Sequence, residues 1–174
     1  MHIEVENLTE TGRPFAHIYG AGALDLADER ARLTGETRIS GRASRQREGV
    51  KLQGEITTTV EINCDRCLTP ISMPVEAAFD VNYVDVETDA ATEEATELQP
   101  EDLSVSFYEG DAIDLDELAR EQVLLALPVR LLCREECKGL CPNCGAERNT
   151  QPCACEDREV DPRWGALATL KDRE

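Results

Sequence analysis

The residues of this chain that could do chemistry are its eight cysteines, and all of them lie in four close pairs. The pairs are Cys64/Cys67, Cys133/Cys137, Cys141/Cys144 and Cys153/Cys155. Thiols gathered in tight turns usually share a metal ion, because two sulfurs from one turn can reach one ion. The first and third pairs have the Cys-x-x-Cys spacing of a knuckle, a turn whose backbone amides point at the sulfurs. The sequence therefore predicts that all eight cysteines are metal ligands.

Two groupings of these pairs into four-thiolate sites are compatible with the sequence. One joins the first pair to the second and the third pair to the fourth. The other joins the second pair to the third and leaves the first pair with the fourth. A closed shell of four thiolates has no open position for water or substrate, so we expect one or two structural ions. Zinc is expected before an iron–sulfur cluster, because knuckles joined to short polar loops are typical of zinc.

The rest of the sequence favours a reducing compartment. It contains no basic start followed by an apolar run, and no apolar stretch of about 18 residues, so we expect neither a signal peptide nor a membrane span. Thiols stay reduced in the cytoplasm, which favours metal binding over disulfides. A thiol redox sensor, acting through Cys137 and Cys141 or through Cys153 and Cys155, is the alternative.

Patterns that indicate catalysis are missing from the sequence. The only histidines are His2 and His17, and there is no Gly-x-Ser-x-Gly elbow, Walker loop or dinucleotide fingerprint. We therefore expect a protein that is not an enzyme.

The net charge of −18 is concentrated in one segment. Residues 67–119 contain 15 acidic residues and no Lys or Arg, whereas the segments before and after it carry −2 and −1. Phosphate backbones repel such a segment, and a basic protein partner fits it better. The alternative is a solvated acidic loop that aids solubility.

Periodicity predicts a sheet followed by a helix. Strands are expected at 2–8, 37–44, 50–62, 75–86 and 104–108, with the central ones forming an antiparallel meander and Cys64/Cys67 at a hairpin-like turn. Residues 12–22 and 70–74 are rich in turn formers, and 23–33 suits a short helix.

Residues 114–127 predict an amphipathic helix capped by Asp114 and ended by Pro128. Its expected apolar face is Leu115, Leu118, Val123, Leu125 and Ala126. A polar loop at 87–101 and a terminal helix from Pro162 to about residue 171, anchored by Leu167 and Leu170, complete the prediction. The fold class is thus α+β: an antiparallel sheet or open barrel with a packed helix in residues 1–130, and a Cys-rich zinc-binding loop with a short helix in 131–174.

Several of these segments together resemble a known bacterial and plastid family. They are Cys64-Asp-Arg-Cys67-Leu68, Ile113-Asp-Leu, the helix with Glu121 and Leu124-Leu-Ala-Leu-Pro128, the string from Leu132 to Gly145, and Asp161-Pro-Arg163 with Leu167 and Leu170. In this order they are similar to the YceD family of large ribosomal RNA subunit accumulation proteins, over about residues 14–171.

The resemblance implies a cytosolic, non-enzymatic factor needed for normal levels of 23S ribosomal RNA. Together with the acidic segment, it suggests a basic ribosomal protein or an rRNA-processing factor as partner. Local RNA contact by Arg130, Arg134, Lys138 and Arg148 stays open, because neighbouring acids dilute that patch. A zinc-dependent protein-interaction module acting outside the ribosome is the other function considered. The sequence does not indicate an oligomeric state.

Overall fold

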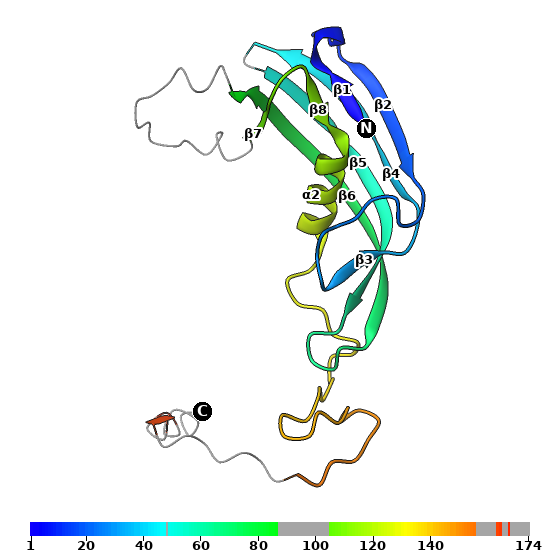
Figure 1. The fold of residues 1–174 in the computed structure, drawn as a ribbon, viewed down its shortest axis with the longest axis vertical. Helices are drawn as coiled ribbons and strands as arrows, with labels where there is room; N and C mark the ends of the chain where they lie inside the picture. Colours follow the sequence, from blue (N-terminus) through cyan, green and yellow to red (C-terminus); the bar gives the residue numbers. More distant parts are fainter. Residues whose placement is uncertain (48, 87–104, 156–162, 165–166, 168–174) are drawn as a thin grey trace. The chain divides into compact units, whose positions relative to one another are not determined.

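The computed structural model describes residues 1–47, 49–86, 105–155, 163–164 and 167 (Figure 1). The chain divides into two compact units. The first contains Met1–Asn63 and Pro70–Leu131, and the second contains Cys64–Thr69 and Leu132–Glu174. Within the described residues, no helix is long and apolar enough to cross a membrane.

Three long strands form the centre of the first unit. β4 (Thr37–Gln46), β5 (Gly49–Asn63) and β6 (Pro70–Asp85) pair as an antiparallel meander. Alternate residues of β5 are buried, among them Val50, Leu52, Ile56 and Val60, because side chains along a strand point to opposite faces. The expected meander is confirmed.

β6 begins earlier than the sequence suggested, because 70–74 belongs to the strand and is not a turn. Pro70 pairs with Asn63, and Pro74 pairs with Thr59. The start of β6 has β5 as its only described neighbour, because β7 pairs with residues 82–85 of β6. The prolines therefore lie on an edge of the sheet, where the missing backbone N–H interrupts no hydrogen bond to a further strand.

Three shorter strands extend the sheet, which has the order β2-β4-β5-β6-β7 with β3 paired to β5. They are β2 (Arg13–Tyr19), β3 (Ala31–Leu33) and β7 (Val105–Tyr108). The turn-rich segment after Gly12 is therefore a strand, contrary to expectation. The expected strand at 104–108 exists, but it runs parallel to β6.

The helix expected at 23–33 does not form. Asp25 and Asp28 instead accept hydrogen bonds from backbone N–H groups two or three residues onward, at 2.7–3.1 Å. Such local bonds stabilise turns in competition with a helix. The chain then enters β3 at Ala31.

One face of the sheet is covered by a short ribbon and a helix (Figure 1). β1 (His2–Glu4) continues into the 3₁₀-helix η1 (Val5–Asn7) and pairs antiparallel with β8 (Ala112–Asp114). α2 (Leu115–Ala126) follows directly, and the side chain of Asp114 accepts from the N–H of Asp116 at 2.8 Å, so the predicted cap is confirmed.

The buried face of α2 consists of Leu115, Leu118, Ala119 and Val123. Leu125, which is 73% exposed, and Ala126 were wrongly expected on it. Both point away from the buried face, which Leu124 and Leu127 continue as partly buried residues packed against the core. The α+β class with a packed helix is nevertheless confirmed.

The expected polar loop at 87–101 and most of the terminal helix lie outside the described residues. Leu167 is 53% exposed, and Leu170 is not among the described residues.

Candidate metal centres

The second unit brings the eight cysteines together in two groups of four. Within each group, the sulfur atoms all lie within 4.8 Å of one another. The first cluster is Cys64, Cys67, Cys133 and Cys137, and the second cluster is Cys141, Cys144, Cys153 and Cys155. This is the first of the two groupings considered above, and the rival grouping is not formed.

The first cluster begins at the turn between β5 and β6. The N–H of Leu68 donates to the carbonyl of Cys64 at 2.9 Å, and the N–H of Cys64 donates to the carbonyl of Thr69 at 2.9 Å. These two bonds close a compact turn that directs both sulfurs to one side. Leu68 has a φ of 60°, in the left-handed region that glycine usually occupies.

The second cluster begins at a turn with the same hydrogen bonds. The N–H of Gly145 donates to the carbonyl of Cys141 at 2.9 Å, and the N–H of Cys141 donates to the carbonyl of Ala146 at 2.8 Å. Gly145 has a φ of 74°. Two distant segments of sequence therefore fold into one kind of cysteine knuckle.

The sulfur separations fit a metal ion. They are 3.8 Å for Cys64–Cys137 and 3.6 Å for Cys67–Cys133 in the first cluster, and 3.5 Å for Cys144–Cys153 and 3.3 Å for Cys141–Cys153 in the second. Four thiolates in a tetrahedron with metal–sulfur bonds of about 2.3 Å would lie roughly 3.8 Å apart, whereas a disulfide requires about 2.05 Å. The donor set and its spacing thus suit a tetrahedral thiolate-binding ion, and all eight cysteines are unpaired.

Asn149 supports the first cluster from the loop of the second. Its side-chain amide donates to the sulfur of Cys137 at 3.4 Å, and its side-chain oxygen accepts from the N–H of Lys138 at 2.9 Å. Hydrogen bonds to ligand sulfurs orient the ligand and stabilise the thiolate. The sequence analysis missed Asn149, because a lone Asn in a polar loop carries no metal-site signal.

Arg66 joins the first knuckle to the segment between the clusters. Its guanidinium donates to the carbonyl of Cys137 at 2.8 Å, and its own carbonyl accepts from the N–H of Leu140 at 3.0 Å. Gly139, with a φ of 70°, lies so close that a Cβ atom there would be 2.9 Å from the Arg66 carbonyl oxygen. The residues between the two cysteines of a knuckle therefore have a structural role here.

Three thiols have lowered pKa values: Cys64, Cys141 and Cys137, the last chiefly through the hydrogen bond from Asn149. Burial opposes ionisation of Cys64, but hydrogen bonds from the backbone N–H groups of Arg66, Cys133 and Cys67 outweigh it and lower the pKa of Cys64 to about 6. The backbone N–H groups of Cys144 and Asn143 likewise lower the pKa of Cys141 to about 6. Each knuckle thus holds its first sulfur ready as a thiolate.

Three other thiols, Cys133, Cys153 and Cys155, have raised pKa values. Loss of solvent around the sulfur, followed by the hydrogen bond with Cys67, raises the pKa of Cys133 to about 12. The hydrogen bond with Cys153 raises the pKa of Cys155 to about 12. Close sulfurs in each cluster share protons, and a bound cation must displace them, so metal affinity should fall as the pH is lowered.

The clusters differ in their exposure to solvent. In the first, Cys64, Cys67 and Cys137 are buried and Cys133 is exposed. In the second, Cys141 is buried, Cys153 is half-buried and both Cys144 and Cys155 are exposed. The second cluster is thus open to solvent, chelators and oxidants on more sides than the first.

Comparison with known proteins shows the family to which this chain is similar. The family model described as "Large ribosomal RNA subunit accumulation protein YceD" matches residues 52–171, a range that contains all eight cysteines. An uncharacterised protein of Mycobacterium tuberculosis is 34% identical over 123 residues, which are 71% of this chain and 56% of that protein. An uncharacterised protein of Bacillus subtilis is 29% identical over 136 residues, covering 76% of this chain and 73% of that protein.

A chloroplast protein of Zea mays carries the family's name. It is called large ribosomal RNA subunit accumulation protein YCED homolog 1, and it is 26% identical over 189 residues, covering 81% of this chain and 61% of that protein. This chain spans little more than half the length of the mycobacterial relatives. No solved structure matches it. Because the family model covers more than half of the chain, the protein described here belongs to the YceD family of large ribosomal RNA subunit accumulation proteins.

Proposed function

We propose that this protein is a cytoplasmic, non-enzymatic factor that supports accumulation of 23S ribosomal RNA and biogenesis of the large ribosomal subunit. The observation that carries the proposal is the family match over residues 52–171, which includes both cysteine clusters and α2. Relatives from chloroplasts are named for large ribosomal RNA subunit accumulation. The four-thiolate clusters suit a structural role, because a closed thiolate shell leaves no position for substrate.

Deletion of the gene tests this function. Ribosomes of the deletion strain are separated on a sucrose gradient, and 23S and 16S ribosomal RNA are quantified. The proposal expects a selective loss of 23S RNA and large subunits, restored by the wild-type gene. An unchanged profile would move the function to a protein-interaction module outside the ribosome.

We further propose that each cluster binds one structural zinc ion. The sulfur spacings of 3.3–3.8 Å and the two matching knuckles support a tetrahedral ion. Binding free energies of about 10–16 kcal/mol are typical of structural zinc, enough to decide the folding of a unit with so little apolar core. Metal analysis of protein purified under reducing conditions should find two zinc ions per chain. Iron together with an equimolar amount of sulfide would instead identify iron–sulfur clusters.

The partner we propose is a basic ribosomal protein or an rRNA-processing factor. The support is electrostatic, because residues 67–119 carry a net charge of −15. Purified protein carrying an affinity tag would be incubated with dissociated large-subunit proteins at low and high salt. Retention of one basic ribosomal protein, weakened by salt, is expected. Retention of RNA without any basic protein would count against this partner.

One observation favours thiol redox sensing as a second function. In the second cluster, the sulfurs of Cys141 and Cys153 are 3.3 Å apart, and two neighbouring thiols are exposed. Oxidation of such a pair would release the bound ion. Mild peroxide treatment that forms a reversible Cys141–Cys153 disulfide and changes 23S RNA levels in cells would support it.

A further inference from the structure

Basic residues are concentrated in one part of this acidic protein. Residues 30–51 contain seven Arg and Lys against two acidic residues, in a chain whose net charge is −18. They cover β3, β4 and the start of β5, all in the first unit. This segment therefore has a local charge opposite to that of the rest of the chain.

Four of these bases are ion-paired. Arg30 pairs with Asp28, Arg32 with Glu61, Arg38 with Glu36, and Lys51 with Asp80. Their charges are thereby largely compensated on the surface of the sheet.

Three arginines of this segment, together with Arg13 of the neighbouring β2, have no such compensation within the described part of the chain. They are Arg13, Arg42, Arg45 and Arg47. Among the described residues, none of their side chains lies within 4.0 Å of a carboxylate oxygen. An exposed guanidinium without a carboxylate partner is available to an external anion.

Backbone contacts gather these arginines around the loop that precedes β2. The guanidinium of Arg42 donates to the carbonyls of Thr11 and Gly12, at 3.2 and 3.0 Å, and Arg13 follows Gly12 directly. The N–H of Arg45 donates to the carbonyl of Thr9 at 3.0 Å. The cation of Arg42 is thereby fixed in place without being neutralised.

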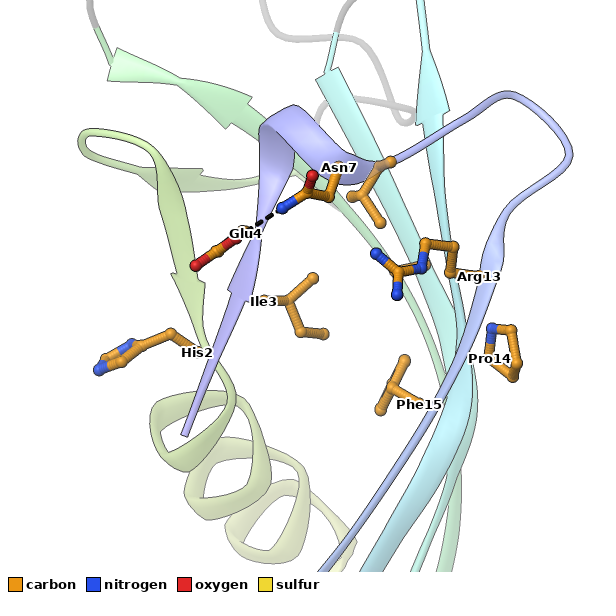
Figure 2. A pocket seen from close by; sticks show the side chains of 9 residues that line it. His2, Ile3, Glu4, Asn7, Arg13, Pro14 and Phe15 are labelled. Carbon is orange, nitrogen blue, oxygen red and sulfur yellow. Dashed lines mark hydrogen bonds between the residues drawn. The ribbon is translucent and has the colours of Figure 1, made fainter.

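The arginines also line concave surface. Arg13 lines a cavity of about 260 Å³ with Ile3 and Phe15, and Figure 2 shows its side chain at that cavity. Arg45 and Arg47 both line a second cavity, of about 830 Å³, together with Lys51 and Asn82. Arg45 and Arg47 therefore lie together at the end of the sheet that holds the β4–β5 turn, and Arg13 lies on the same face as Arg45, because it pairs with Ala43. Arg42 lies on the opposite face of the sheet.

We infer that Arg13, Arg45 and Arg47 form a binding site for the phosphodiester backbone of RNA. A single phosphate would engage one or two of these groups, whereas a polyanion with successive phosphates engages them all. Guanidinium groups bind phosphate oxygens through paired N–H donors, which makes arginine well suited to this contact. This inference rests on the proposed ribosomal function only in its choice of RNA over other polyanions.

The carboxylates near these arginines limit the affinity of RNA binding. Glu10 lines the larger cavity, and Asp85 lines a third cavity of about 190 Å³ beside Arg45 and Arg47. These carboxylates and the negative net charge limit affinity. Contacts of this kind read phosphates and not bases, so the site positions RNA without selecting a sequence.

Fluorescence anisotropy with a labelled single-stranded RNA of 20 nucleotides tests the site. The protein is titrated over a series of KCl concentrations, and the slope of log Kobs against log[KCl] is measured. The double variant R45Q/R47Q should bind at least about tenfold more weakly at low salt, with a slope smaller by about 1.4, since each lost phosphate contact removes about 0.7. R42Q is not used, because Arg42 lies on the opposite face of the sheet and holds the loop that precedes β2.

The matched control is R32Q/R38Q, which removes the same formal charge from ion-paired positions of the same sheet. Its affinity should stay within about twofold of the wild type. Equal weakening by both double variants, or no binding of wild type at about 100 µM protein, would overturn the site. Zinc content and circular dichroism show that each variant is folded. Because this assay contains only protein and RNA, its outcome is independent of whether gene deletion lowers 23S RNA.

Discussion

Leu68 and Gly145 occupy the same position of two matching turns, each following the second cysteine of a knuckle, with φ angles of 60° and 74°. Both donate their N–H to the carbonyl of the first cysteine at 2.9 Å. The left-handed conformation costs an ordinary residue roughly 1–2 kcal/mol and costs glycine almost nothing. Leu68 is 59% exposed, so burial of its side chain offsets little of this cost.

Leu68→Gly should therefore stabilise the protein. Relief of backbone strain, reduced by the greater freedom of glycine in the unfolded chain, should raise the free energy of unfolding by about 0.5–1 kcal/mol. The measurement is urea denaturation at a fixed free zinc concentration, because bound metal stabilises the folded state by mass action. Gly145→Leu is the reciprocal control and should destabilise by a similar amount. A loss of stability in Leu68→Gly would mean that the leucine side chain makes contacts that matter.

The two clusters should release metal at different rates. Three cysteines are buried in the first cluster, whereas only Cys141 is buried in the second. A chromogenic chelator should therefore remove one equivalent of zinc quickly and the other slowly. Cys155→Ser should abolish the fast phase, and Cys67→Ser the slow one. Release of both ions in one phase would show that exposure does not control the rate.

Asn149→Ala should weaken metal binding at the first cluster, although Asn149 is no ligand. Loss of its 3.4 Å hydrogen bond to the Cys137 sulfur should reduce zinc affinity about 10–100-fold. Competition with a chelator of known affinity measures this loss. Gln151→Ala, which changes an exposed side chain in the same turn, is the control and should leave affinity unchanged. An effect confined to the second cluster would contradict the assignment of Asn149 to the first cluster.

All three tyrosines should resist ionisation in the folded protein. Burial raises the pKa of Tyr83 to about 12, and burial also raises the pKa of Tyr19 and of Tyr108. A pKa raised above the unfolded value of about 10 stabilises the fold fully below that pH. This contribution is lost as pH rises through the folded pKa, so stability should fall between about pH 10 and 12.

Absorbance at about 295 nm, which reports tyrosinate, should therefore rise together with loss of the far-ultraviolet dichroism signal. The reference pKa of about 10 is that of a solvated phenol. Tyrosinate formed at pH 10 in protein that remains folded would refute the prediction. Tyr83→Phe should shift the unfolding transition to higher pH, because it removes one group that must ionise.

Local sequence patterns predicted the strands and the helix start that depend on neighbouring residues alone. β-branched alternation identified β4 and β5, and Asp114 marked the start of α2. The spacing of Cys64 and Cys67 indicated a knuckle at a hairpin turn, but only the fold decides which distant pair completes it.

Other features depend on contacts that no local pattern encodes. β2 reads as a turn-rich segment because it contains Pro14, and only pairing with β4 makes it a strand. β3 is three residues long, and it forms because Ala31 and Leu33 pair with Ile62 and Val60 of β5. The contacts of Arg66 and Asn149 to Cys137 likewise arise only when segments distant in the sequence meet.

The sequence separation within each cluster bears on how the protein assembles during synthesis. The second cluster closes a ring of about 15 residues, whereas the link from Cys64 to Cys137 closes one of about 74. The longer closure costs about 1.4 kcal/mol more in chain entropy, and it cannot occur until Cys137 has left the ribosome exit tunnel. The hairpin of β5 and β6 should therefore emerge with a half-built thiolate site. The site is complete only when Cys137 follows, 52 residues after the end of β6, so the more deeply buried cluster has exposed, unpartnered thiols for the longest time during synthesis.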